Sequence, residues 1–219
     1  MKKAFISWSG GKDSMLALYR AIRMVDVPYL LNMLSEDGSV SRSHGLSAEL
    51  LKAQAAAMGK VIVQKPSTWK GYEEAFKKAV LELKGKGITV GVFGDIELQE
   101  HRDWIERVCS ELEIEPVFPL WGIDRIELIN EFISSGFRAI VVSTRAEILG
   151  EEWLGREIDW EFVKDMKAMV GVDLCGEKGE YHTFVFDGPI FLCPVGFVVG
   201  GIRREEGRLF LELSHEEKR

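Results

Sequence analysis

Short apolar runs alternate with amphipathic stretches along the first half of the chain. The apolar runs have the length of strands and lie at Lys3–Trp8, Pro28–Leu34, Lys60–Gln64 and Ile88–Phe93. The stretches between them repeat apolar residues at helical spacing, over Ser14–Val25, Leu46–Met58, Tyr72–Lys84 and Arg102–Leu112. Strands that alternate with helices predict right-handed crossovers and a parallel sheet covered by helices on both faces. The first half is therefore predicted to be α/β and Rossmann-like.

The pattern changes after Glu115–Gly122, EPVFPLWG, which holds two of the six prolines. Beyond it the chain predicts two helices, Asp124–Ser135 and Trp160–Met169, with a strand at Arg138–Ser143 between them. Three short β-type runs follow, which we expect to be antiparallel, at Pro189–Cys193, Phe197–Ile202 and Arg208–Leu213. The prediction is two domains, an α/β domain over residues 1–120 and a smaller α+β domain over residues 121–219.

Composition places the chain among ordinary globular proteins. Its 219 residues, 46% of them hydrophobic, can bury a normal core. No run approaches the roughly 20 apolar residues that cross a bilayer. The N-terminus starts with lysines but becomes polar and glycine-rich within a few residues, so we expect no secretory signal. We therefore expect a cytoplasmic protein without a membrane partner; the oligomeric state is left open, a homodimer included.

Charge and cysteine content argue against several functions. The formal net charge is −7, and basic residues alternate with glutamate in stretches such as KAVLELKGK, which indicates solvated helix faces rather than a basic stripe for nucleic acid. Cys109, Cys175 and Cys193 include no C-x-x-C pair. The four histidines and three cysteines show no helical pairing, so neither a redox site nor a zinc site is expected.

The candidate chemistry lies where the first predicted strand runs into the first helix, at Ser9-Gly10-Gly11-Lys12-Asp13-Ser14. The carboxyl end of such a strand opens onto a crevice, and the following helix offers free N–H groups to an anion. Two glycines let the backbone turn tightly beside a phosphate. Lys12 adds a positive charge, Ser9 and Ser14 add hydroxyl donors, and Asp13 would organise the loop or help to bind Mg²⁺. We expect this loop to face solvent.

The loop is not a Walker A motif, because Ile6 stands where that motif needs glycine and Asp13 where it needs serine or threonine. After an N-terminal strand, SGGKDS resembles the PP-loop of the N-type ATP pyrophosphatases, which include GMP synthetase, NAD synthetase and asparagine synthetase. This resemblance implies a Rossmann-like, adenine nucleotide α-hydrolase-like fold. It also implies cleavage of MgATP to AMP and pyrophosphate through an adenylated substrate.

Further segments narrow the resemblance over nearly the whole chain. Gly94-Asp95-Ile96, Pro119–Gly122, Trp153–Arg156 and Gly176–Thr183 together are similar to the diphthine–ammonia ligases. The resemblance implies that a substrate carboxylate attacks the α-phosphate of ATP, pyrophosphate leaves, and ammonia displaces AMP. The carboxylate would belong to diphthine on a translation elongation factor. The last segment departs from the expected E-G-G-E-[FY]-E-T, because Lys178 replaces a glycine and His182 a glutamate. These departures leave the identity of the adenylated substrate open.

The resemblance also points to site residues outside the loop. We expect His44, Gly94 and Asp95 beside the nucleotide; His101 is a weaker candidate there. Glu177, Glu180 and Arg156 are expected on the substrate side, because carboxylates can orient ammonia or Mg²⁺.

An extended backbone would place Glu180 and His182 on one face, where the pair could act as acid or base and join Lys12 and Asp13 as catalytic residues. Carboxylates in a surface turn and an exposed loop histidine are the plainer alternatives. Two rival functions also remain open: a sulfur- or tRNA-directed pyrophosphatase, and a nucleotide sensor without catalysis.

Overall fold

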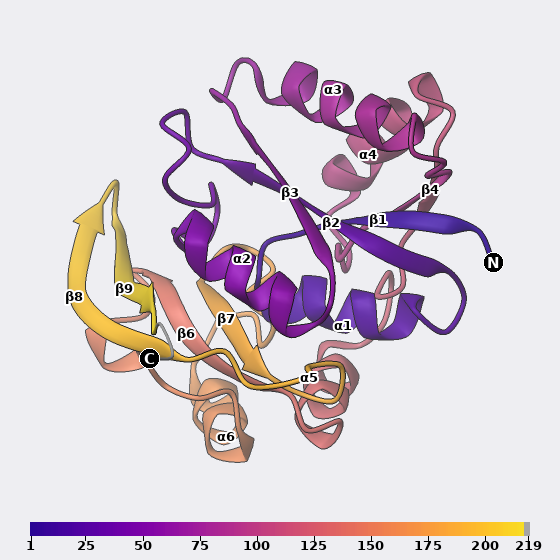
Figure 1. Cartoon of the computed structure of the whole chain (residues 1–219). Helices are drawn as coiled ribbons and strands as arrows, with labels where there is room; N and C mark the ends of the chain where they lie inside the picture. Colours follow the sequence, from indigo (N-terminus) through magenta and orange to yellow (C-terminus); the bar gives the residue numbers. More distant parts are fainter. Residues whose placement is uncertain (217–219) are drawn as a thin grey trace.

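A five-stranded parallel sheet forms the centre of the computed structural model, in which residues 1–216 are described. Its strand order is β3-β2-β1-β4-β5 (Figure 1). The strands are β1 (Lys3–Ser7), β2 (Asp26–Leu34), β3 (Val61–Pro66), β4 (Val90–Val92) and β5 (Glu115–Val117). The chain moves outward from β1 to β3 and then returns to the other side of β1. The order therefore reverses between β1 and β4, and a crevice is expected outside their carboxyl ends.

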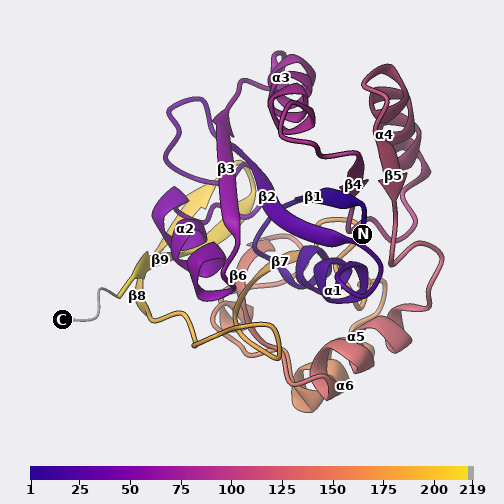
Figure 2. The same cartoon turned by 45° about the vertical axis from the view of Figure 1, so that its right-hand side comes forward.

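Helices cover both faces of this sheet. The helices are α1 (Lys12–Ala21), α2 (Ala48–Ala57), α3 (Tyr72–Lys84) and α4 (Gln99–Glu111). Side chains alternate along β1, so that Phe5 packs with α3 and α4 while Ala4 and Ile6 pack with α1 and α2. Figures 1 and 2 show α3 and α4 on one side of the sheet and α1 and α2 on the side that faces the C-terminal half. The predicted parallel α/β architecture is confirmed.

The C-terminal half contains an antiparallel sheet of order β7-β6-β9-β8. Its elements are α5 (Arg125–Ser134), β6 (Arg138–Arg145), a 3₁₀ turn η1 (Glu151–Trp153), α6 (Trp160–Ala168), β7 (Tyr181–Asp187), β8 (Phe197–Glu205) and β9 (Arg208–His215). Aspartates Asp124 and Asp159 cap the N-termini of α5 and α6. The expected antiparallel arrangement of the last strands is confirmed.

One continuous hydrophobic core joins the two halves. Leu16 of α1 and Leu51 of α2 belong to the same buried cluster as Phe132 of α5 and Phe184 of β7. The backbone N–H of Val185 in β7 also donates to the carbonyl of Gly10, at 3.0 Å. The antiparallel sheet is therefore packed directly behind the Ser9–Ser14 loop.

Three element predictions differ from the structure. Pro189–Cys193 is not a strand, because a turn closed by the N–H of Phe191 and the carbonyl of Gly188 runs through it. Ile190 and Phe191 pack against the core from this irregular backbone. Two strands were not predicted: β5 is short and lies in the segment interpreted as a domain boundary, and β7 starts within the glycine-rich motif. Among the described residues, no helix is both long and apolar enough to cross a membrane.

Candidate functional site

The Ser9–Ser14 loop connects β1 to α1 at the carboxyl edge of the parallel sheet. Gly10 has a φ of +84°, and a Cβ there would lie 2.4 Å from a methyl carbon of Leu51. A Cβ on Gly11 would lie 2.5 Å from Nε2 of His44. Gly10 is therefore required by the turn and by the packing behind the loop, whereas Gly11, at a φ of −90°, is required by the packing alone. Gly11, the residue before α1, has no side chain to cap this helix, so the N–H groups of Asp13 and Ser14 in its first turn are available to an anion.

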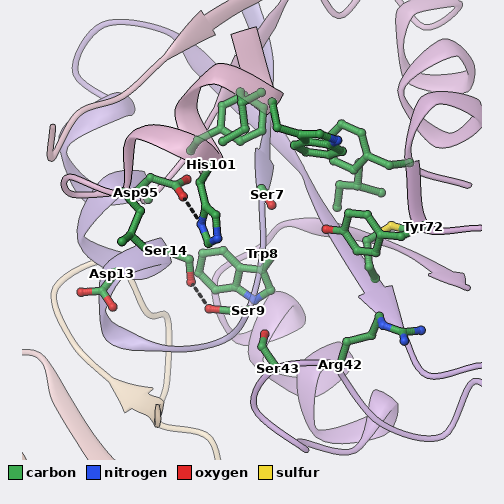
Figure 3. Close-up of a pocket in the computed structure, with 18 of the residues that line it drawn as sticks. Ser7, Trp8, Ser9, Asp13, Ser14, Arg42, Ser43, Tyr72, Asp95 and His101 are labelled. Carbon is green, nitrogen blue, oxygen red and sulfur yellow. Dashed lines mark hydrogen bonds and ion pairs between the residues drawn. The ribbon is translucent and has the colours of Figure 1, made fainter. Parts of the chain in front are cut away.

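A cavity of about 590 Å³ opens in front of this loop. Figure 3 shows that Ser9, Asp13 and Ser14 of the loop face it together with Asp95 and His101. Its floor is formed by the carboxyl ends of β1, β2 and β4, and one wall by aromatic side chains of α3 and α4. The hydroxyl oxygens of Ser9 and Ser14 lie 3.1 Å apart. The cavity thus occupies the crevice that the strand order predicts, and Gly94 and Asp95 line it as expected.

Lys12 does not face this cavity, and the expectation of a solvent-facing loop is wrong at this residue. Its side chain is buried, and Nζ donates to both carboxylate oxygens of Asp13, at 2.9 and 3.1 Å, and to the carbonyl of Cys175. Nζ also lies 5.1 Å from the centre of the Tyr181 ring. Burial opposes the ammonium charge, but the Asp13 carboxylate, together with Tyr181 and Cys175, outweighs it and raises the pKa of Lys12 above its usual value. Lys12 therefore links the loop to the C-terminal half.

The glycine-rich motif binds to both loops of the parallel sheet. Thr183 Oγ1 accepts the N–H of Lys12 at 3.0 Å, and Glu177 Oε1 accepts the N–H groups of Ile96 and Glu97 at 3.2 and 3.3 Å. Glu177 lines the cavity, as predicted for a substrate-side residue. Burial raises the pKa of Glu177, and the nearby Asp13 carboxylate adds to this effect. The motif therefore closes one side of the cavity and fixes its position.

The other two predicted motif residues point away from the cavity. Glu180 is only 2% exposed; its Oε1 accepts the N–H of Asp173 at 3.1 Å, and its Oε2 has no partner among the described residues. His182 instead stacks on His44, with ring centres 4.4 Å apart. The described residues show no hydrogen bond between Glu180 and His182. The structure therefore does not bring them together as an acid–base pair.

The two stacked histidines lie behind the loop rather than in front of it, because His44 packs against Gly11 on the side of β7. Burial, together with the weaker effect of the Lys12 and Arg208 cations, lowers the pKa of His44 to about 3. Burial also lowers the pKa of His182, with His44 and Arg208 contributing. Both rings are therefore neutral near pH 7.

Arg156 lies elsewhere in the C-terminal half. Its guanidinium donates to Asp165 at 2.8 Å and lies 4.6 Å from the Trp153 ring centre. It is absent from the cavity lining. Arg156, which the family resemblance suggested as a substrate-side residue, is therefore a packed surface arginine outside the cavity.

Several cavity residues were not predicted as site residues. They follow the carboxyl ends of β2 and β3 or lie on α3 and α4, and they include Arg42, Ser43, Trp69, Tyr72 and Trp104. His101, the weaker candidate, lines the cavity with its Nδ1 3.3 Å from Asp95 Oδ1, a contact that raises the pKa of His101. Their position in the sequence could have indicated them, because residues that follow parallel strands meet at one edge of the sheet.

The site fits a magnesium ion that is bound to a nucleotide, rather than one held by protein side chains alone. No group of three or more carboxylate, histidine or cysteine side chains among the described residues is arranged to hold a metal. Mg²⁺ that is bound to a nucleotide needs only one or two carboxylates, since phosphates and water complete its shell. Asp13 and Asp95 both line the cavity beside the loop and interact electrostatically. They are the pair that would hold such an ion.

Comparison with known proteins agrees with the motif. The model of the diphthamide synthase N-terminal domain matches residues 1–116, and that of the C-terminal domain matches residues 124–206. Diphthine–ammonia ligase of Danio rerio is 35% identical over 114 residues, which are 50% of this chain and 43% of that protein. The Homo sapiens ligase is 34% identical over 110 residues, 48% of this chain and 40% of that protein. These matches span less than half the length of either relative.

Among solved structures, one described as a predicted subunit of tRNA methyltransferase from Methanocaldococcus jannaschii has a TM-score of 0.43 and 16% identity. It covers 84% of this chain and 96% of that chain. A similarity of this size supports no statement about function. The two family models, by contrast, together match the greater part of the sequence, and the chain therefore belongs to the diphthamide synthase family.

Proposed function

We propose that this protein is an AMP-forming ligase that adenylates the carboxylate of diphthine and amidates it with ammonia. The observation that carries the proposal is the SGGKDS loop, which opens onto the main cavity at the point where the strand order reverses, in a chain of the diphthamide synthase family. The loop lacks the Walker arrangement that positions a γ-phosphoryl group for transfer. The expected reaction is therefore attack of the substrate on the α-phosphorus of ATP.

The residues in front of the loop would bind and orient the nucleotide. The N–H groups of Asp13 and Ser14 at the start of α1 and the hydroxyl group of Ser9 are donors for the pyrophosphate portion. Such donors are fixed before the reaction, so they stabilise negative charge that grows on the leaving pyrophosphate without reorganising. Asp13 and Asp95 would hold Mg²⁺, which neutralises phosphate charge when bound.

The proposed reaction balances in two steps. A carboxylate oxygen of the substrate forms a bond to the α-phosphorus, and the bond from that phosphorus to the β-bridging oxygen breaks, which gives an acyl adenylate and pyrophosphate. The nitrogen of ammonia then bonds to the acyl carbon, AMP leaves, and a proton is released. Asp95 and His101, which are in contact and face the cavity, are the nearest candidates to receive that proton.

The experiment is to incubate the protein with MgATP, ammonium and diphthine-bearing elongation factor, and to measure nucleotides by chromatography and the protein product by mass spectrometry. AMP and pyrophosphate should form in equal amounts with the amide. Omitting ammonium should stop amide formation but leave exchange of labelled pyrophosphate into ATP. ADP as the main product would contradict the reaction type, and AMP formation without amide would contradict the substrate.

A further inference from the structure

The charged side chains around the cavity do not match a nucleotide alone. Four carboxylates line it, from Asp13, Asp95, Glu100 and Glu177, whereas Arg42 contributes the single guanidinium of the lining. Lys12 compensates Asp13 from behind. Asp95, Glu100 and Glu177 remain beside the place where the phosphates of ATP, which are themselves anions, would lie. One nucleotide-bound metal offsets part of this charge, and a positively charged group on the substrate would offset more.

Two aromatic rings on the same side of the cavity form a wedge. Tyr72 at the start of α3 and Trp104 of α4 have ring centres 5.8 Å apart and planes inclined by 51°. Both rings are held in place: Trp104 Nε1 donates to Glu73 at 2.9 Å, and the Tyr72 ring stacks on Phe76, which is buried. The wedge is therefore rigid before any ligand enters.

The angle between the two ring planes limits the shape of the chemical group that they can bind. A flat base stacks on one ring or between two parallel rings. A wedge of 51° cannot place both of its faces against a plane, but it can place both against a compact, nearly spherical group. Aromatic faces attract cations, and cages of such rings bind quaternary ammonium groups. Glu100 and Asp95 line the same cavity and add negative charge.

Arg42 is the cation of the lining that acts on this wedge. Its guanidinium lies 4.1 Å from the ring centre of Trp69, so that this charge already faces a ring of the protein. Burial and the Asp95 carboxylate raise the pKa of Tyr72, and the Arg42 guanidinium opposes them with a smaller effect. The stronger of the two charges that act on Tyr72 is therefore negative.

We propose that the Tyr72–Trp104 wedge, with Asp95 and Glu100, binds the trimethylammonium group of diphthine and so selects a carboxylate that carries a neighbouring fixed positive charge. This inference rests on the proposed function. In diphthine the trimethylammonium nitrogen and the reacting carboxylate are bonded to the same carbon atom. Seating the cation in the wedge therefore limits where the carboxylate can lie, and the loop that binds the α-phosphate opens onto the same cavity.

The test compares two small probes, glycine betaine and 3,3-dimethylbutanoate, which share a carboxylate and a trimethyl head but differ in the charge of that head. Binding of each probe to the full chain, saturated with a non-hydrolysable ATP analogue, is measured by ligand-observed NMR. The protein should prefer betaine by about tenfold or more. Tyr72→Leu and Trp104→Leu should remove the preference and change the affinity for ATP by less than about threefold.

Controls separate recognition from folding. Tyr72→Phe and Trp104→Phe keep a ring face and should keep the preference, as should Trp160→Leu, which removes an exposed tryptophan on α6. Equal binding of the two probes, or no binding of betaine, would overturn the inference. A loss of ATP affinity as large as the loss for betaine would assign the rings to the base instead. Because probe binding needs no turnover, a failure of amidation with the preference intact would contradict only the proposed function.

Discussion

The front and the rear of the Ser9–Ser14 loop differ in what surrounds them. In front, Ser9, Asp13 and Ser14 border an open cavity whose other polar groups come from separate strands and helices. Behind, Lys12, His44 and Thr183 are packed against one another and against the C-terminal sheet. Adjacent residues of one short motif therefore have different tasks. The residues in front of the loop are placed to contact a ligand, and the residues behind it hold the loop in a shape that permits this contact.

This comparison predicts the largest effect on turnover for Asp13. Asp13→Asn keeps the size of the side chain but removes its charge, and it should lower kcat/KM by about 10²-fold or more, because the charge beside the phosphates and their metal is lost. The melting temperature should also fall, because the buried Lys12 ammonium loses its counterion, so turnover is measured well below that temperature. Steady-state kinetics and thermal denaturation measure the two quantities. Asp37→Asn, in an exposed turn, is the matched control; wild-type turnover in Asp13→Asn would contradict the assignment of Asp13 to the front.

Lys12 should affect stability more than Asp13 does, because its side chain is the more deeply buried partner of their ion pair. Lys12→Ala leaves the Cys175 carbonyl without its donor and removes the partner of Asp13, so we expect the free energy of unfolding to fall by about 2–4 kcal/mol. Affinity for ATP should weaken as well, because the loop loses its side-chain link to the Cys175 carbonyl. Denaturant unfolding and calorimetry test this, with Lys52→Ala on the exposed face of α2 as the control. An unchanged unfolding midpoint would show that the buried contacts of Lys12 do not hold the loop.

Glu180 tests whether the glycine-rich motif Gly176–Thr183 is structural or faces the substrate at this residue. Glu180→Gln can keep the hydrogen bond from Asp173 but inserts an amide N–H₂ into a buried position, and it should cost about 1–2 kcal/mol of stability. Turnover by the folded protein should persist, since this side chain does not face the cavity. Kinetics well below the melting temperature decide the point. If turnover disappears while stability and ATP affinity are retained, Glu180 is a substrate-side residue, as the motif alone suggested.

The effect that is smallest near neutral pH is a pH dependence of stability from the pair His44 and His182. The pKa of His44 is lowered to about 3 in the folded state from an ordinary value near 6.5, so between these values the unfolded state binds more protons. Stability should therefore fall as the pH drops from about 6.5 toward 3, by up to about 1 kcal/mol per pH unit for each histidine. His44→Phe keeps an aromatic ring against His182 and should flatten this slope in urea titrations. An identical slope in wild type and variant would place the titration elsewhere.

Much of the fold followed from local pattern. The helix Tyr72–Lys84 has the predicted bounds, because Gly71 and Gly85 flank a clear apolar repeat. Strand β7 could not be predicted in the same way, since Tyr181 and His182 belong to a polar motif and become a strand by pairing with β6. The candidate site shows the same division: the loop was visible in the sequence, whereas the ring wedge on α3 and α4 was not, because Tyr72 and Trp104 are far apart along the chain.

By itself, the sequence determined the α/β class, the phosphate-type loop at the first strand–helix junction and the family, because each depends on residues that are neighbours along the chain. Only the tertiary structure decided which face of the loop each residue occupies. Lys12 is buried because the Cys175 carbonyl, 163 positions away, accepts its hydrogen bond, and β7 occupies the space behind the glycines. Contacts between residues so far apart along the chain leave no local pattern. The sequence alone therefore does not distinguish a lysine that contacts a phosphate from one that connects two parts of the fold.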